Sequence, residues 1–182
     1  MVKPLLFSFL TILFIFFHFS GNSQVSKSGP IINDFGKVYK IENPDFKIHV
    51  DKEYKAVIDV TGKPDSHSQR NPLIETAARF LNMHAQSGVP AEKLKVALVV
   101  HGAASKDVIS NEAYQKRYGK DNPNTKLIKS LLQTEVPVII CGQSVTYHKI
   151  EKSDLIDGVQ MALSAMTALV HLQGEGYQLI KF

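Results

Sequence analysis

Five short apolar runs, separated by longer segments of mixed polarity, constrain the fold of this chain more than any other feature. Two of them are apolar throughout and rich in β-branched residues, which is typical of strands buried on both faces of a parallel sheet. The runs cover residues 56–60, 96–100, 136–140, 159–163 and 177–180. Each is too short for a buried helix, so the sequence predicts strands at these places.

Signals for helices stand between these runs. Asn71 and Pro72 are typical of a helix start, because Asn caps free N–H groups and Pro fits the first turn. Asn122 and Pro123 give the same signal for a second helix, and Ser164 gives a capping signal for a third. Strands that alternate with helices predict βαβ crossovers, and hence an open parallel sheet with helices on both faces.

The remaining segments carry weaker signals. Residues 105–121 form a polar stretch to which we assign no helix or strand. Residues 24–52 are also polar, and their weak alternation indicates one short edge hairpin over 38–41 and 46–50. We therefore expect a polar N-terminal leader over residues 24–52, followed by one α/β domain over residues 53–182.

Residues 1–23 have the order of a secretory signal peptide. Lys3 precedes an apolar run over residues 5–17, and the small residues Gly21 and Ser23 favour cleavage before Gln24. This run is shorter than the roughly 20 residues that a spanning helix needs, and small polar residues follow it instead of a charged flank. We expect an exported protein, located in the bacterial periplasm, with no membrane anchor after cleavage.

Composition argues against several classes of partner and site. Lys and Arg are interspersed with Asp and Glu, and the chain has no Trp, so we expect no binding of nucleic acid. The histidines lack the paired short spacing of a metal site, and no glycine-rich phosphate loop is present, so we expect neither metal nor cofactor. Cys141 is the only cysteine, which means that the fold holds without a disulfide.

Reactive side chains follow the two central apolar runs, where open parallel sheets place their ligand sites. These residues are His101 and Gly102 after the first run, and Cys141, Gly142, Gln143 and Ser144 after the second. A helix that starts near Gln143 or Ser144 would lower the pKa of the Cys141 thiol and make it a nucleophile. The alternatives are a Cys141 that packs as a small hydrophobe and a His101 that only satisfies hydrogen bonds.

A set of short motifs resembles the DsrE/DsrF-like family over roughly residues 54–182. The motifs are VVHGA at 99–103, NPN at 122–124, CGQS at 141–144, LSA at 163–165 and LQGEGY at 172–177. The resemblance implies a flavodoxin-like three-layer α/β sandwich, with a mostly parallel sheet of about five strands. It also implies assembly into a homo-trimer or homo-hexamer.

The same resemblance implies a role for Cys141, because sulfur-relay members of the family carry a persulfide on a cysteine at this strand end. Cys141 would then be the sulfur carrier, His101 a neighbour that polarises the site, and a protein with a thiol or persulfide the partner. The candidate ligand-binding residues are Gly102, Asn124, Gly142, Gln143 and Ser144.

Three functional hypotheses remain open on the sequence alone. The first is an exported sulfur carrier or sulfurtransferase, which requires a thiol that a sulfur donor can reach. The second is a noncatalytic oligomeric protein that binds a small ligand, with Cys141 buried and slow to alkylate. The third is a redox sensor in which Cys141 oxidises reversibly or pairs across an oligomer interface.

Overall fold

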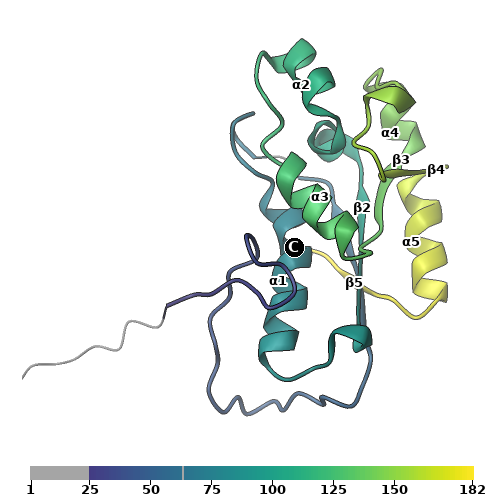
Figure 1. Ribbon diagram of the computed structural model, residues 1–182. Coiled ribbons are helices and arrows are strands. Elements are labelled where there is room, and N and C mark those ends of the chain that lie inside the picture. The colour runs from purple at the N-terminus through teal and green to yellow at the C-terminus, as the bar shows by residue number, and fades with distance from the viewer. Residues whose placement is uncertain (1–24, 63) are drawn as a thin grey trace, which may run out of the picture.

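One all-parallel sheet forms the centre of the protein, as seen in a computed structural model that describes residues 25–62 and 64–182 (Figure 1). The strand order is β4-β3-β2-β1-β5. The strands are β1 Tyr54–Val60, β2 Leu94–Val100, β3 Val138–Cys141, β4 Gln160–Ala162 and β5 Gln178–Ile180. The five strands predicted from the apolar runs are confirmed, and the sheet has the parallel pairing that βαβ crossovers produce.

Helices cover both faces of this sheet, which completes a three-layer sandwich of the flavodoxin-like type (Figure 1). Helices α1 Pro72–Gln86 and α3 Thr125–Gln133 pack on one face, and α5 Ala165–Gly174 packs on the other. The shorter helices are α2 Asn111–Tyr118, α4 Gly142–Tyr147 and the 3₁₀ turns η1 Ala91–Lys93, η2 Gly102–Val108 and η3 Lys152–Asp154. Helices α2 and α4 lie beyond the carboxyl ends of the central strands.

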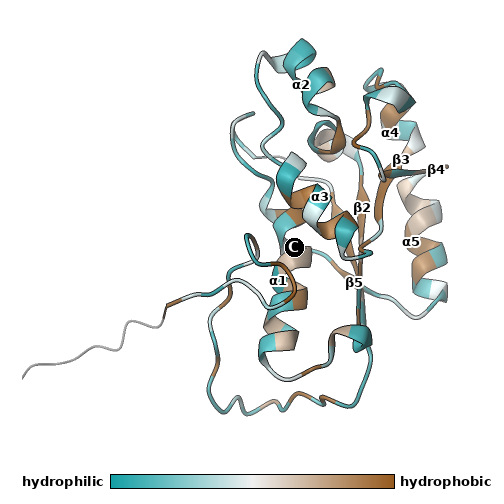
Figure 2. Ribbon diagram, in the orientation of Figure 1, coloured by the Kyte–Doolittle hydropathy of each residue, from teal (hydrophilic) through white to brown (hydrophobic). Residues whose placement is uncertain are grey.

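The alternation of side chains along the strands divides the interior into two clusters. Ile58, Leu98 and Ile140 point toward α1 and α3 and belong to the larger cluster. Val99 and Cys141 point the other way, into a smaller cluster beneath α5. Figure 2 shows the apolar strands enclosed between helices whose outer sides are more polar. Cys141 is thus fixed on the α5 face of the sheet.

Two helix starts follow the sequence signals. The Asn71 side chain accepts a hydrogen bond of 3.0 Å from the N–H of Leu73, and Pro72 is the first residue of α1. Ser164 caps α5 by accepting a bond of 3.0 Å from the N–H of Thr167. In both cases a short polar side chain satisfies an N–H group that has no partner within the helix.

The third predicted start, at Asn122, is displaced, because helix α3 begins at Thr125. The Asn122 amide donates instead to the carbonyl groups of Asp107 and Ile109, at 2.9 and 2.7 Å. An amide used in this way holds a neighbouring loop in place and does not cap the helix.

The polar stretch over residues 105–121 also differs from the prediction, since it contains most of η2 and all of α2. Ser110 caps α2 by accepting a bond of 3.2 Å from the N–H of Ala113. Tyr114 on this helix is fully buried. A single buried aromatic ring and one cap therefore support a helix whose other residues are mostly polar.

No edge hairpin forms over residues 38–41 and 46–50, and in the described part of the N-terminal region only one isolated antiparallel bridge occurs, between Lys27 and Val38. Residues 27–38, called the N-terminal strap below, instead lie against α1. Ile32 and Phe35 of the strap are buried in the larger cluster. A segment that looks like a polar leader thus contributes to the core.

Asn82 on α1 holds the N-terminal strap in place. Its side-chain oxygen accepts bonds from the N–H groups of Ile31 and Ile32, and its nitrogen donates to the carbonyls of Ile32, Phe35 and Gly36. All of these contacts measure between 2.9 and 3.2 Å. One buried amide therefore satisfies several backbone groups of a segment that has no regular secondary structure.

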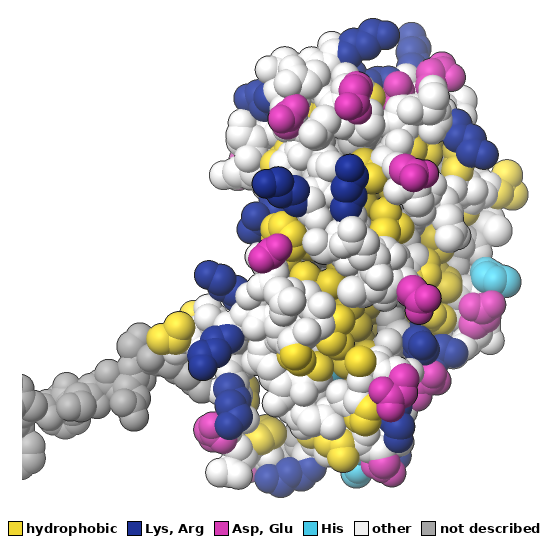
Figure 3. Space-filling model, viewed as in Figure 1, with side chains coloured by type: hydrophobic (Ala, Val, Ile, Leu, Met, Phe, Trp, Pro, Cys, Tyr) yellow, Lys and Arg dark blue, Asp and Glu magenta, His cyan; other side chains and the backbone are white. Residues whose placement is uncertain are grey.

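The predicted signal peptide, residues 1–23, lies outside the described residues. Within the described ranges, no helix is both long and apolar enough to cross a membrane. On the face drawn in Figure 3, basic and acidic side chains are interspersed around small apolar areas.

Candidate functional site

The carboxyl ends of β2 and β3 bring an imidazole and a thiol to the same face of the sheet. His101 continues the extended backbone of β2, with φ −155° and ψ 176°, and its N–H bonds the carbonyl of Val60 at 3.0 Å. In the parallel register Val99 pairs with Ile139, so the next position on that face pairs His101 with Cys141. The two residues predicted from their strand ends are therefore neighbours on the α5 face.

Asp59 on β1 adds a carboxylate beside His101 on the α5 face of the sheet. Its Oδ1 lies 2.7 Å from His101 Nε2, and its Oδ2 lies 3.5 Å from Lys181 Nζ. Because an ionised carboxylate only accepts hydrogen bonds, Nε2 carries a proton in this contact. In the neutral ring Nδ1 is then the free acceptor, and the carboxylate fixes the orientation of the imidazole.

The Cys141 thiol is buried, with the residue only 5% exposed, and donors surround its sulfur. These donors are the Ser144 hydroxyl and the N–H groups of Ser144, Ala165 and Gln143. Burial raises the pKa of the Cys141 thiol, but the hydrogen bonds outweigh burial and leave its pKa below the ordinary value. The negative charge of a thiolate is therefore stabilised where α4 and α5 both begin.

Ser144 is oriented by a contact from the neighbouring strand end. Its Oγ accepts a hydrogen bond of 3.0 Å from the N–H of Gly102, which leaves the hydroxyl proton to point at the Cys141 sulfur. Gly102 has φ +59°, a left-handed backbone conformation that glycine adopts without strain. Gly102 thus acts on the thiol through Ser144.

Gly142 allows β4 to approach the start of α4. A Cβ at this position would lie only 2.7 Å from the carbonyl oxygen of Ala162. Gln143 is exposed, and its side-chain nitrogen donates to the carbonyl of Leu163 at 3.3 Å. Both residues therefore join the thiol loop to the chain segment that leads into α5.

Asn124, the remaining predicted ligand-binding residue, is fully buried in a different network. Its Oδ1 accepts from the N–H of Asn71 at 2.7 Å, and its Nδ2 donates to Asn122 Oδ1 at 3.2 Å. The Asn71 side chain donates in turn to Asp107. These bonds connect three loops, and the structure does not bring Asn124 into contact with Cys141 or His101.

Asp59 is the functional residue that sequence reasoning missed. The signal was present, because Asp59 is the one charged residue in the apolar run over residues 56–60, and a buried acid needs a partner. Among the described residues, no group of three or more His, Cys, Asp or Glu could hold a metal ion.

Comparison with known proteins identifies a family for this chain. The model of the DsrE/DsrF-like family matches residues 55–182. No protein of curated function matches the chain significantly.

Two solved structures share the fold. The first is the protein of unknown function MTH1491 from Methanobacterium thermoautotrophicum, with a TM-score of 0.53, 16% identity, and coverage of 71% of this chain and 100% of that one. The second is the ychN protein from E. coli, with a TM-score of 0.53, 19% identity, and coverage of 71% and 99%. The family match covers well over half of the sequence and includes both strand ends of the site, so this chain belongs to the DsrE/DsrF-like family.

Proposed function

We propose that this protein is a sulfur carrier or sulfurtransferase that works through a persulfide on Cys141. The observation that carries the proposal is the set of hydrogen-bond donors around the Cys141 sulfur, from the Ser144 hydroxyl and from the N–H groups at the starts of α4 and α5. A thiolate is the form of cysteine that attacks sulfur, and these donors increase its population at neutral pH.

The reaction we propose balances without an external oxidant or reductant. The Cys141 thiolate attacks the outer sulfur of a hydrodisulfide or longer polysulfide, forming one S–S bond and breaking another. The electron pair of the broken bond leaves with hydrosulfide when the donor is a hydrodisulfide, and with a polysulfide shortened by one sulfur atom when the donor is longer. In both cases the cysteine retains a persulfide. An acceptor thiolate then attacks the outer sulfur of the persulfide, and the Cys141 thiolate is released.

His101 and Asp59 support this chemistry in the proposal. The bond of 2.7 Å to the Asp59 carboxylate fixes the orientation of the His101 imidazole at the strand end next to that of Cys141. His101 is a positioning and polarising residue here, and Cys141 alone forms the covalent bond.

Intact mass measurement tests the proposal. Purified protein, free of reducing agent, is incubated with polysulfide, its free thiols are capped, and its mass is compared with that of Cys141→Ser. We expect one added sulfur atom in the wild type and none in the variant. A wild-type mass that polysulfide leaves unchanged would overturn the proposal.

A second candidate function, binding of a small ligand with Cys141 as a packing residue, is favoured by the burial of Cys141. The two functions differ in the reactivity of the thiol toward small reagents. The sulfur-transfer proposal expects methyl methanethiosulfonate to react quickly, and a bulky aromatic disulfide to react slowly because access is narrow. If both reagents react only after unfolding, ligand binding is the better account.

We also propose that the protein is exported to the periplasm and assembles there into a homo-trimer or homo-hexamer. The order of residues 1–23 supports export. Assembly is supported by three exposed apolar residues, two on α5 and one just before its capping residue Ser164. They are Leu163, Met166 and Val170, which are 73%, 75% and 71% exposed. This set of three residues is called the α5 outer row below. Mass measurement in solution by light scattering tests the assembly.

A further inference from the structure

A groove lies between helix α5 and strand β4, which forms one edge of the sheet (Figure 1). Its volume is about 280 Å³. The apolar part of its wall consists mainly of Ile139, Ala162, Leu163, Ala168 and Leu172. Ile139 and Ala162 are only partly buried, so α5 leaves apolar side chains of the sheet accessible along this edge.

The groove adjoins the thiol site. Ile139 stands two positions before Cys141 on β3, so both side chains point to the α5 face and belong to the same small cluster. Ala162 is paired with Cys141 in the register of β3 and β4. The carbonyl of Leu163 accepts the bond of 3.3 Å from the Gln143 side chain. Residues that line the groove are therefore in direct contact with the loop that carries the thiol.

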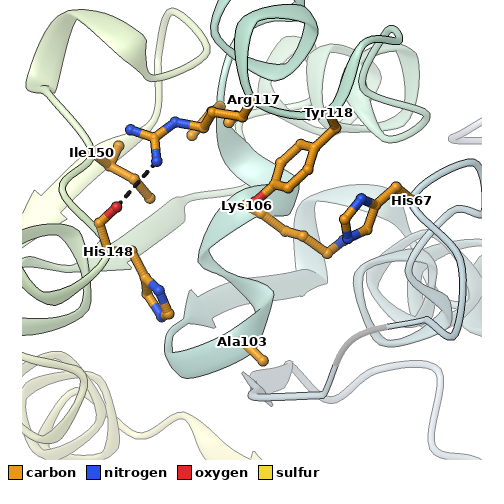
Figure 4. A pocket seen from close by; sticks show the side chains of 8 residues that line it. His67, Ala103, Lys106, Arg117, Tyr118, His148 and Ile150 are labelled. Atoms are coloured by element: carbon orange, nitrogen blue, oxygen red, sulfur yellow. Dashed lines mark hydrogen bonds between the residues drawn. The ribbon is translucent and has the colours of Figure 1, made fainter.

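The groove offers no cation to an anionic ligand. Among the described residues that line it, none is Lys, Arg, Asp or Glu. Its polar lining residues are Gln160, Thr167 and His171. His171 Nε2 lies 3.1 Å from Glu175 Oε1, so this histidine already faces a carboxylate. The pocket drawn in Figure 4 differs, because Lys106 and Arg117 line it.

These properties favour a hydrocarbon chain over an inorganic anion. Thiosulfate or inorganic polysulfide would lose part of its hydration between β4 and α5 without gaining an opposite charge. A hydrocarbon chain would instead remove water from the exposed apolar side chains of the groove, which is favourable.

We propose that the groove holds the hydrocarbon chain of a small alkyl hydrodisulfide, R–S–SH, while the outer sulfur of this compound is transferred to Cys141. The inference rests on the proposed function and names the chemical class of its sulfur donor. The volume restricts R to a few carbon atoms, because pockets for drug-sized molecules measure about 300 to 1,000 Å³.

The transfer balances without a further oxidant or reductant. The Cys141 thiolate attacks the outer sulfur of R–S–SH, so that one S–S bond forms and another breaks. The electron pair of the broken bond leaves with the alkanethiolate R–S⁻, which takes a proton from water. The outer sulfur and its hydrogen remain on Cys141 as the persulfide.

Rates of persulfide formation with three donors test the inference. The donors are butyl hydrodisulfide, methyl hydrodisulfide and sodium disulfide, and intact mass measures the addition of one sulfur atom to the purified protein. Each rate is divided by the rate of the same donor with free cysteine, which gives a corrected rate. The butyl donor should exceed each of the other two at least roughly tenfold, because full burial of each methylene contributes about fourfold.

Two variants add a carboxylate to the groove from different elements. Gln160→Glu acts from β4 and keeps the size of the side chain, and His171→Glu acts from the exposed side of α5, so it remains informative if Gln160→Glu folds poorly. Both should lower the ratio of the butyl to the methyl rate at least roughly threefold, because a chain that covers a carboxylate removes its water. Gln160→Leu should raise the same ratio.

The matched control is Gln133→Glu, the same change at an exposed position on α3, which should keep the wild-type ratio. Equal corrected rates with the butyl and methyl donors would overturn the inference, and so would a ratio that neither Gln160→Glu nor His171→Glu lowers. If sodium disulfide still adds sulfur to Cys141 in that case, the proposed function stands without the groove. If no donor adds sulfur, both proposals fail.

Discussion

The two faces of the sheet are covered in different ways. On one face, α1, α3 and the N-terminal strap enclose large side chains such as Ile58 and Leu98. On the other face, α5 alone covers a small cluster built around Val57, Ala97 and Val99. The α5 outer row remains exposed on this second face.

This difference separates stability from chemistry. The face under α1 and α3 holds the larger buried cluster, and burial of apolar area is the main source of folding free energy. The face under α5 holds Asp59, His101 and Cys141 in one row at the carboxyl edge. Changes on the first face should therefore alter stability, and changes on the second should alter assembly and thiol reactivity.

The largest effect on stability is expected from Asn82→Ala. Loss of the amide leaves buried backbone groups of the N-terminal strap without partners, which should lower the free energy of unfolding by about 3 kcal/mol. Urea unfolding measures the change. The control is Asn33→Ala, an exposed position in the same strap, which should cost little. A loss below about 1 kcal/mol for Asn82→Ala would mean that the strap is not part of the cooperative core.

Gly36→Ala should destabilise the same face by a smaller amount. Gly36 has φ +69°, and a Cβ there would lie 2.4 Å from the carbonyl carbon of Ala78 on α1. We expect a loss of about 2 kcal/mol from backbone strain and overpacking together. Gly119→Ala is the matched control, since Gly119 has the same φ of +69° but no atom within 4 Å of the added Cβ. Equal losses of unfolding free energy in the two variants would show that the N-terminal strap moves away from α1 and relieves the overlap with the added Cβ.

Met166→Glu tests the exposed side of the α5 face. A charge in the α5 outer row should dissociate the proposed oligomer into monomers without unfolding them, because a carboxylate in an apolar interface loses its hydration. Light scattering and circular dichroism measure the two properties. Met83→Glu, at an exposed methionine on α1, should keep the wild-type mass. The interface lies elsewhere if Met166→Glu also keeps that mass.

Ser144→Ala should have the smallest effect on stability and a measurable effect on the thiol. Removing the hydroxyl donor should raise the pKa of Cys141, so that the thiolate fraction at neutral pH falls. The rate of reaction with methyl methanethiosulfonate should then decrease roughly threefold to tenfold. Ser130→Ala, a change at an α3 hydroxyl that bonds only its own helix, serves as the control. An unchanged rate in Ser144→Ala would remove Ser144 from the account of the site.

Local signals in the sequence were sufficient to predict the strands of the sheet and the starts of two helices. The run at β2 is apolar at almost every position, and the caps at Asn71 and Ser164 act on their own helices. The strap could not be predicted in this way, because Asn82 binds backbone groups about 50 positions earlier in the chain. A polar residue with distant partners leaves no periodic signal.

The candidate site could be predicted only in part, because some of its contacts also join residues that are distant in the sequence. Strand ends identified Cys141 and His101, since parallel strands bring their carboxyl ends together. The contact between Asp59 and His101 crosses from one strand to the next, and the donation from Gly102 to Ser144 depends on how two loops meet. Such contacts depend on the packed structure, so residue type and spacing alone could not reveal them.

The most direct test of the central claim is a titration of the Cys141 thiolate by its ultraviolet absorbance, with Cys141→Ser as the baseline. The hydrogen-bond donors around the sulfur stabilise the charged form, so the account predicts a half-titration point below the ordinary value of 9.0. A half-titration point at or above 9.0 would show that burial outweighs the hydrogen bonds, and Cys141 would then be a packing residue.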